Sequence, residues 1–260
     1  MKILAIGNSF SVDGMEHIYQ VAENLGAKEI VLGDLYIGGC SLERHAGNIE
    51  NDLPAYEYYF NNSGEWHITK ETRVSDVINQ YDWDYVSLQQ VSGKSGKGET
   101  YEPYLTYILD YVHKMLPNTK VMWHMTWAYP KDSDNGSFAG YDYNQDLMYT
   151  SICNTVQALI VPRKDFSLVI PDGTAIQNAR TCFYGDNFAR DNLHLSYGKG
   201  RYIAALMWVK SVFGLDIDKT TWTPEGSEIS PRLLAAMKEA VDNAYAKPFQ
   251  VTKSTYTDGE

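Results

Sequence analysis

The stretch Lys2–Ser11, KILAIGNSFS, opens with a run of apolar residues and breaks off at Gly-Asn-Ser. A short apolar run bounded by turn residues is typical of a buried strand, so we predict the first strand at Lys2–Ile6. Apolar residues at helical spacing follow between Asp13 and Gly26, and this glycine suits the C-cap of a helix. Ser9 therefore stands in the loop between a strand and a helix, which is how a βαβ unit begins.

Short apolar runs continue to alternate with longer stretches of helical period, which predicts βαβ units around a parallel sheet. Further strands are expected at Glu29–Tyr36, Asp84–Gln89, Lys120–Met125 and Phe166–Ile170. Helices are expected at Val74–Tyr81, Tyr104–Leu116, Tyr143–Ile160, Thr174–Arg180 and Ser196–Phe213. We therefore predict an α/β fold, a three-layer α/β/α sandwich with a flavodoxin-like parallel sheet of about five strands.

Three segments depart from this alternation. Leu42–Phe60 has partly helical character until a proline interrupts it, and Trp66–Thr69 is expected as a short extra strand. The glycine- and lysine-rich residues 91–100, VSGKSGKGET, predict a flexible loop. No repeat or low-complexity block divides the chain, so we expect one domain over residues 1–247 and a loose polar tail over residues 248–260.

The composition limits the classes of partner. With 33 acidic and 22 basic residues the net charge is −11, which opposes nucleic acid and acidic membranes as partners. No apolar run approaches the roughly 20 residues that span a bilayer, so we expect no membrane insertion. The 20 Tyr and 6 Trp residues offer flat apolar faces with polar edges, which suit sugars but also fill protein cores. A neutral small molecule or a glycan is therefore the expected substrate class.

The cysteines indicate neither a disulfide framework nor a metal site. Cys40, Cys153 and Cys182 are far apart, odd in number and in no CxxC spacing. We interpret them as small buried hydrophobic residues and expect no metal. The first predicted strand leaves no room for a signal peptide, so we expect a soluble protein of the cytoplasm, or a secreted or periplasmic one if a leader has been removed.

Ser9 draws attention because ligands of open parallel sheets bind beyond the carboxyl ends of the strands. A serine hydroxyl is a weak nucleophile unless a base, usually a histidine, takes its proton, and a carboxylate must hold that base. His194 lies in RDNLHLSYGKGRYIAA, just before the last predicted helix, and Asp191 precedes it by three residues. Asp186 is the alternative carboxylate in the same loop, and the three-residue spacing favours Asp191.

The other histidines fit structural roles better. Four of them, His17, His45, His67 and His113, lie in predicted helices or irregular surface segments. His124 lies in the fourth predicted strand, where a structural role is also expected.

A serine at the end of the first strand and a D-x-x-H before the last helix together resemble the SGNH, or GDSL-like, hydrolase family. The G-D-S block of that family reads Gly7-Asn8-Ser9 here, and D-x-x-H reads Asp191-Asn192-Leu193-His194. Within the superfamily, the segments IGNSFS, LQQ and DNLHLSYGKGRYIAA are most similar to DUF4886, a domain family common in gut bacteria. The resemblance covers most of the chain.

The resemblance also implies an oxyanion hole made of the serine N–H, a glycine N–H after the second strand and an asparagine after the third. YIGGCSL supplies Gly39, which we prefer to Gly38 by its place in the motif. The asparagine is missing from VSLQQVSG, so Gln89 or Gln90 is expected to donate instead, and strand alternation favours Gln90.

We predict a serine esterase in which His194, oriented by Asp191, activates Ser9 to form an acyl-enzyme without a cofactor. The aromatic content and the resemblance point to a short acyl group, acetyl above all, on a carbohydrate. Trp127 and Tyr129, in HMTWAYP after the fourth strand, either line the pocket or pack in the core.

Residues after the fifth strand could also reach the site, since PDGTAIQNAR could place Asp172 or Arg180 at its rim. Two alternatives to the esterase remain at this stage. The same triad could transfer an acyl group to a sugar as a carbohydrate O-acyltransferase, or the altered third block could mark a glycan-binding domain without catalysis. The sequence gives no indication of the oligomeric state.

Overall fold

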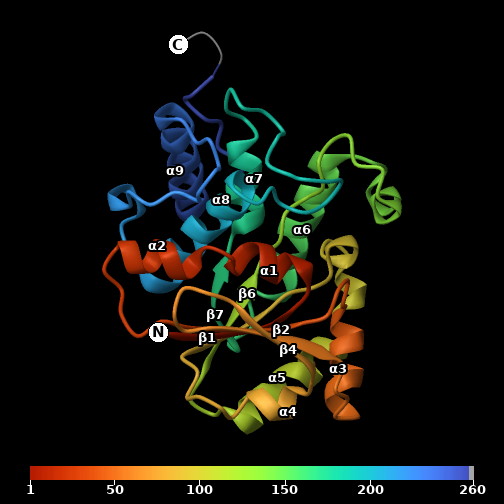
Figure 1. Ribbon diagram of the computed structural model, residues 1–260. Helices are drawn as coiled ribbons and strands as arrows, with labels where there is room; N and C mark the ends of the chain where they lie inside the picture. Colours follow the sequence, from red (N-terminus) through yellow and green to blue (C-terminus); the bar gives the residue numbers. More distant parts are fainter. Residues whose placement is uncertain (258–260) are drawn as a thin grey trace.

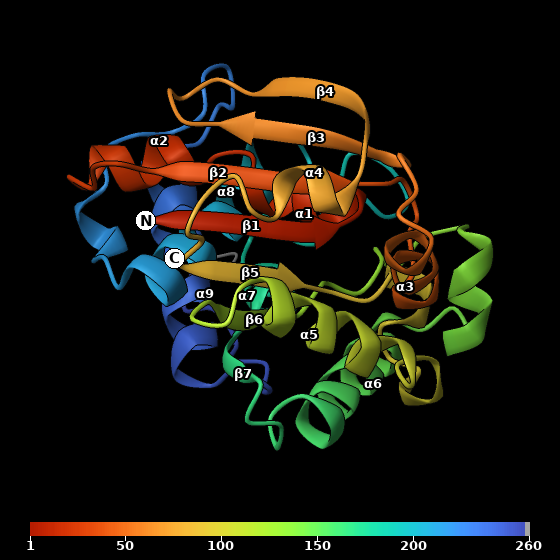
Figure 2. The same ribbon diagram turned by 90° about the horizontal axis from the view of Figure 1, so that it is seen from below.

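A seven-stranded mixed sheet forms the centre of the computed structural model, which describes residues 1–257. Its strand order is β4-β3-β2-β1-β5-β6-β7, as Figure 2 shows from top to bottom. The five parallel strands are β1 (Lys2–Gly7), β2 (Val31–Tyr36), β5 (Tyr85–Leu88), β6 (Lys120–His124) and β7 (Phe166–Ile170). They coincide with the five predicted strands, and their spatial order, second-first-third-fourth-fifth along the chain, is the flavodoxin-like order.

An antiparallel hairpin extends the sheet beyond β2. It consists of β3 (Tyr56–Asn61) and β4 (His67–Thr72), and β3 pairs with β2. We predicted β4 in part, but the partly helical interpretation of Leu42–Phe60 holds only for its first half, helix α3 (Leu42–Glu50). Beyond Pro54 the aromatic side chains of YEYYF favour a strand, because aromatic residues pack well on a half-buried pleated surface.

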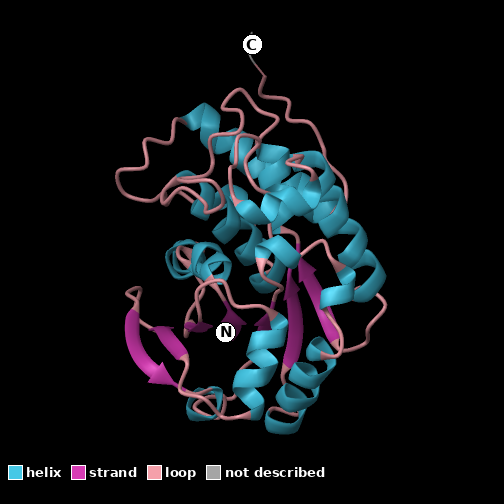
Figure 3. Ribbon diagram, turned by 90° about the vertical axis from the view of Figure 1, so that its right-hand side faces the viewer, coloured by secondary structure: helices cyan, strands magenta, loops and turns pink. Residues whose placement is uncertain are grey.

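Helices cover both faces of the sheet and complete the three predicted layers (Figures 1 and 3). One face carries α1 (Ser9–Met15), α2 (Ile18–Asn24), α7 (Asp172–Ala179), α8 (Lys199–Trp208) and α9 (Pro231–Ala246). The other carries α3, α4 (Val74–Val77) and α5 (Tyr104–Met115). Helix α6 (Gln145–Leu159) packs against α7, and a π-helical turn, Val209–Phe213, continues α8.

The first helix begins earlier than predicted, at Ser9 itself. Asn8 is its N-cap, and the Asn8 side chain accepts the N–H of Phe10 at 3.0 Å. Asparagine is among the best N-cap residues because its short side chain reaches the N–H groups that the first turn leaves unpaired. The serine therefore occupies the first helical position rather than a loop.

Residues 248–257 are held against helices α7 and α9, so the prediction of a loose tail is wrong for this segment. The N–H of Thr252 is bonded to Asn178 of α7 at 2.7 Å, and the hydroxyl of Ser254 donates to Glu239 of α9 at 2.6 Å. A polar composition therefore does not imply a loose segment here, because these polar groups find partners on two helices. Residues 258–260 of the predicted tail lie outside the described residues.

The core lies between the sheet and the two helix layers. The three cysteines are buried and unpaired, as expected of small hydrophobic residues. The predicted flexible loop, residues 91–100, forms two short 3-10 turns that bury Ser92 and Ser95. In the part of the chain that is described, no helix is long and apolar enough to cross a bilayer.

Candidate active site

Ser9 lies where β1 ends and α1 begins, at the carboxyl edge of the parallel sheet. Its hydroxyl oxygen is 2.8 Å from Nε2 of His194, a residue 185 positions away in the sequence. The Ser9 side chain is half-buried, so it remains open to a small molecule from one side. This distance is within the range over which a histidine can take a serine proton.

His194 is held by a local turn that Asp191 organises. One carboxylate oxygen of Asp191 accepts the N–H groups of Leu193 and His194 at 2.9 and 2.7 Å. The other oxygen is 2.9 Å from Nδ1 of the His194 ring. This arrangement favours a proton on Nδ1, which leaves Nε2 free to accept from Ser9.

The charge of Asp191 suits this role. Partial burial raises the pKa of Asp191, but the two backbone N–H groups and the His194 ring outweigh that effect, and the net pKa lies below its usual value. The carboxylate therefore stays ionised over the pH range in which a histidine changes charge, and it can stabilise a protonated imidazole.

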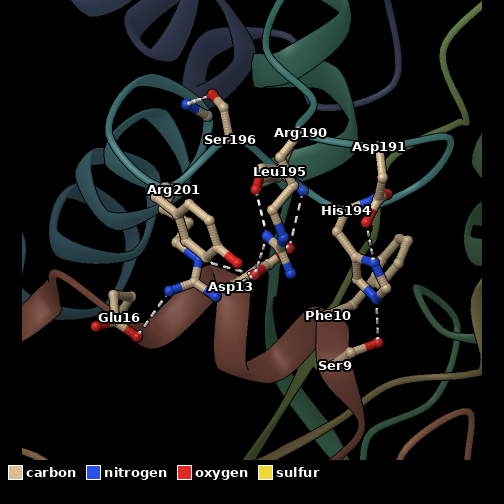
Figure 4. A network of polar contacts seen from close by, with 12 residues as sticks. Ser9, Phe10, Asp13, Glu16, Arg190, Asp191, His194, Leu195, Ser196 and Arg201 are labelled. Atoms are coloured by element: carbon tan, nitrogen blue, oxygen red, sulfur yellow. Dashed lines mark hydrogen bonds and ion pairs between the residues drawn. The ribbon is translucent and has the colours of Figure 1, made fainter. Parts of the chain in front are cut away.

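Asp13, four residues after Ser9 on α1, anchors the loop that carries His194 (Figure 4). Its fully buried carboxylate pairs with Arg190 at 2.9 Å and with Arg201 at 2.8 Å, and it accepts the N–H of Leu195 at 2.8 Å. Helix α1 thus carries both Ser9 and Asp13, the residue that holds the His194 loop in place. We did not single out Asp13 from the sequence, although its i, i+4 spacing from Ser9 would indicate a shared helix face once the helix is known to start at Ser9.

Trp127 and Tyr129 belong to the core, so of the two roles considered for them, lining the pocket or packing in the core, the first is wrong. Each is 1% exposed. The Trp127 indole stacks on Phe10 with ring centroids 4.2 Å apart, and its N–H donates to the carbonyl of Leu193. Trp127 therefore supports the His194 loop from beneath. The Tyr129 hydroxyl lies 2.8 Å from that of Ser92.

Two backbone N–H groups near Ser9 are free to bind an anion. Gly39 is the third residue of a tight turn closed by the Cys40 N–H and the Ile37 carbonyl, and its φ of 62° suits glycine. Within residues 1–257, no group accepts the N–H of Gly39 or that of Ser9. Both N–H groups therefore remain candidates for the oxyanion hole.

Both glutamines are bonded within the protein, and these bonds use up the Gln90 carboxamide, which corrects its expected role as the third donor. The Gln90 carboxamide accepts from Leu42 and Val91 and donates twice to Thr100. It thus links the loop before α3 to residues 91–100 and has no donor to spare. Gln89 is buried and donates to Asn8 at 2.7 Å. Both side chains serve the protein itself.

The remaining candidates lie away from Ser9. Asp186 forms an ion pair with Arg180 at 2.6 Å, so it is not the carboxylate of His194. Arg180 and Asp172 are buried and do not form a rim. Asp172 instead contacts His124, the histidine of the fourth strand, at 2.7 Å. In the described part of the chain, no group of three or more histidine, cysteine and carboxylate side chains is arranged to hold a metal ion.

The fold is the one seen in solved structures of SGNH hydrolases. A proposed SGNH hydrolase from Slackia heliotrinireducens superimposes with a TM-score of 0.55 at 18% identity, covering 81% of this chain and 98% of its own. A catalytic mutant of Axe2, an acetylxylan esterase from Geobacillus stearothermophilus, has a TM-score of 0.50 at 15% identity, covering 83% and 95%. These likenesses confirm the fold.

A family match shows where the chain belongs by sequence. The model of the domain of unknown function DUF4886 matches residues 2–244, so the chain belongs to this family, as its motifs predicted. A DUF4886 protein from Bacteroides uniformis is 39% identical over 97% of both chains, with a TM-score of 0.91. Comparison with curated proteins gave no match.

Proposed function

We propose that this protein is a serine ester hydrolase whose triad is Ser9, His194 and Asp191. The observation that carries the proposal is the unbroken contact from Asp191 through both ring nitrogens of His194 to the Ser9 hydroxyl, at 2.9 and 2.8 Å. The fold shared with SGNH hydrolases supports it. The same contacts would serve acyl transfer to a sugar, and nothing in the site favours that alternative acceptor over water.

The reaction proceeds in two halves. His194 Nε2 takes the Ser9 hydroxyl proton as the oxygen attacks the ester carbonyl carbon, and the N–H groups of Ser9 and Gly39 receive the oxyanion. The protonated His194 then gives its proton to the leaving alkoxide, which departs as the alcohol. Water next gives a proton to His194 and attacks the acyl carbon, after which the carboxylic acid leaves and Ser9 regains its proton.

For substrate we propose a short acyl ester, acetyl above all, of a neutral carbohydrate. Phe10 and Trp127 fill the space beneath the His194 ring, and buried Asn8 and Gln89 lie behind Ser9, so the acyl side has little depth. The net charge of −11 disfavours anionic esters. The activity named for Axe2, on acetylated xylan, agrees with this choice.

The test is turnover of p-nitrophenyl acetate, butyrate and octanoate, followed by labelling with a fluorophosphonate and mapping of the modified residue. We expect acetate esters to be preferred, Ser9 to be labelled, and Ser9→Ala to lose turnover while keeping the fold. Ser75→Ala, which changes an exposed serine of α4, is the control. Labelling at another serine, or undiminished turnover by Ser9→Ala, would refute the triad. With an acetylated xylooligosaccharide and an added sugar acceptor, acetylated acceptor forming faster than free acetate would indicate a transferase.

A further inference from the structure

Behind Ser9, a network of buried side chains connects five elements of the fold, α1, β5, β6, α7 and α8. Asn8 accepts from Gln89 at 2.7 Å, Gln89 is 2.8 Å from Nδ1 of His124, and Nε2 of His124 is 2.7 Å from Asp172. Trp208 of α8 donates its indole N–H to the same Asp172 oxygen at 3.0 Å. Each of these five side chains is at most 2% exposed. The chain runs from the start of α1 across the ends of β5 and β6 to the start of α7.

Backbone groups fix the direction of the hydrogen bonds from Asn8 to Nδ1 of His124. The Asn8 oxygen must be an acceptor because the Phe10 N–H donates to it, and its nitrogen must be a donor because it meets the carbonyl of Cys40 at 3.0 Å. Gln89 therefore presents its nitrogen to Asn8 and its oxygen to His124. It follows that Nδ1 of His124 carries a proton.

His124 and Asp172, at the far end of this hydrogen-bonded series, together carry no net charge. The 2.7 Å contact between Nε2 of His124 and Asp172 holds one proton, whichever of the two atoms it is bound to. Burial raises the pKa of Asp172, which the His124 and Trp208 hydrogen bonds partly offset. The pair is thus neutral as a whole, and Nδ1–H of His124 remains a donor in either case.

Asn8 joins this buried chain to both proposed oxyanion donors. The Asn8 side-chain oxygen accepts the Phe10 N–H and so caps α1, while the Ser9 N–H has no partner within residues 1–257. The Asn8 side-chain nitrogen donates to the Cys40 carbonyl and so holds the turn that contains Gly39. We propose that Asn8, Gln89 and His124 are positioning residues that set the Ser9 and Gly39 N–H groups at the spacing an oxyanion needs. This inference rests on the proposed ester hydrolysis and assigns Gln89 to the support of the site.

The positioning role requires an amide at position 8, because its N–H donates to the Cys40 carbonyl. An aspartate has the same shape but no hydrogen to give to Cys40, so Asn8→Asp places two oxygens face to face and releases the glycine turn. Gln89→Glu sets a carboxylate against the Asn8 oxygen in the same way. At position 124, asparagine can replace the Nδ1 donor, whereas glutamine reaches about as far as Nε2 and cannot serve Gln89.

The experiment measures kcat and KM for p-nitrophenyl acetate in these four variants, with active sites counted by fluorophosphonate labelling. We expect kcat per labelled site to fall on the order of 100-fold in Asn8→Asp with KM little changed, because the donors act mainly in the transition state. Gln89→Glu and His124→Gln should fall in the same direction, and His124→Asn should recover part of the loss. Val112→Ala, which opens a cavity in the buried face of α5, controls for lost stability and should keep its kcat per site.

The outcomes separate the two proposals. Wild-type kcat per labelled site in Asn8→Asp and Gln89→Glu, with Ser9→Ala inactive, would overturn the positioning role and leave the esterase standing. A wild-type protein that is neither labelled nor active would overturn both the esterase proposal and the positioning role. Independently of activity, 15N NMR of the imidazole assigned through His124→Asn should show a proton on Nδ1. An unprotonated Nδ1 would contradict the direction of the hydrogen bonds inferred from Asn8 through Gln89 to His124.

Discussion

Ser9 and Asp13 lie one turn apart on α1, and the loop that carries His194 contacts both of them. His194 meets the Ser9 hydroxyl at 2.8 Å, and the next residue, Leu195, donates its N–H to Asp13 at the same distance. Because one short helix carries both contact points, its rigidity sets the separation between the proposed nucleophile and base.

Asp13→Asn should lower both stability and activity. The carboxylate is buried and pairs with Arg190 and Arg201, so the substitution leaves two guanidinium groups with an uncharged partner. Breaking such a buried pair costs about 3 kcal/mol of unfolding free energy. We also expect kcat for p-nitrophenyl acetate to fall, because the His194 loop loses its anchor. Urea unfolding and steady-state kinetics measure the two effects.

The control for this change is Glu16→Gln, which removes a half-buried partner of Arg201 at 3.1 Å. A partly exposed ion pair contributes only about 0.5 kcal/mol, so this variant should resemble wild type. Equal stability of the two variants would show that Asp13 is not the anchor.

Asp191→Asn should lower kcat by about 1000-fold or more while leaving the fold intact. The carboxamide cannot stabilise a protonated His194, and its N–H group can turn the ring to the wrong tautomer. Asp132→Asn, at an exposed carboxylate of the neighbouring loop, is the matched control. Retention of kcat by Asp191→Asn would mean that His194 acts without this carboxylate.

Asp34→Asn should stabilise the protein increasingly as the pH rises. Asp34 lies in β2 at 1% exposure. The neighbouring Ser11 hydroxyl donates to the Asn8 carbonyl, so within residues 1–257 neither carboxylate oxygen receives a hydrogen bond. Burial raises the pKa of Asp34 from 3.8 to about 8. Between those values the folded chain keeps a proton that the unfolded chain has released, so this residue makes folding less favourable as the pH increases.

The measurement is the difference in unfolding free energy between Asp34→Asn and wild type. It should grow by about 1.4 kcal/mol per pH unit between about pH 5 and pH 7.5 and level off above pH 8. Taking the difference removes the contributions of the histidines, which both proteins share. A difference that does not change with pH would show that Asp34 is ionised in the folded protein.

Gly14→Ala should destabilise the protein although alanine is the better helix former. A Cβ at this position of α1 would lie 3.0 Å from the His124 ring and 3.1 Å from the Trp208 indole nitrogen. Both rings are buried and hydrogen-bonded to Asp172, which restricts their movement. Overpacking of this kind typically costs about 1–3 kcal/mol, at least as much as the gain of about 1 kcal/mol in helix propensity. Thermal and urea unfolding measure the net effect.

Gly47→Ala on α3 is the control and should stabilise the protein. No atom lies within 4 Å of its Cβ position, so only the propensity gain of about 0.5–1 kcal/mol should appear. If both variants are stabilised, the close contact of α1 with the His124 ring does not constrain the helix.

The parallel sheet could be predicted because its strands are short, mostly apolar runs between turn residues. β3 could not, because its residues YEYYFN come soon after a helical stretch and lack the regular apolar and polar alternation of a half-buried strand. The early start of α1 depends on Asn8 acting as a cap, and Gly-Asn-Ser is equally ordinary in a loop.

Ser9, His194 and Asp191 could be found from the sequence because each lies in a short motif with a chemical reason for its spacing. The roles of Gln89 and His124 could not, because they depend on backbone groups of Phe10 and Cys40 that only the fold brings to Asn8. Propensity and alternation describe single elements and contain no information on which carboxamide meets which carbonyl.

The bonds of Asn8 also bear on how the protein ages. Asparagine followed by serine is prone to lose ammonia, since the next backbone nitrogen can attack the side-chain carbonyl carbon, and such residues are among the thermolabile ones. In the folded chain the Asn8 carboxamide is engaged by Phe10, Gln89 and Cys40 and is not free to turn toward the Ser9 nitrogen. Deamidation at this position should therefore be confined to unfolded molecules, and samples stored near their melting temperature should accumulate a fraction that refolds with an acid beside Ser9.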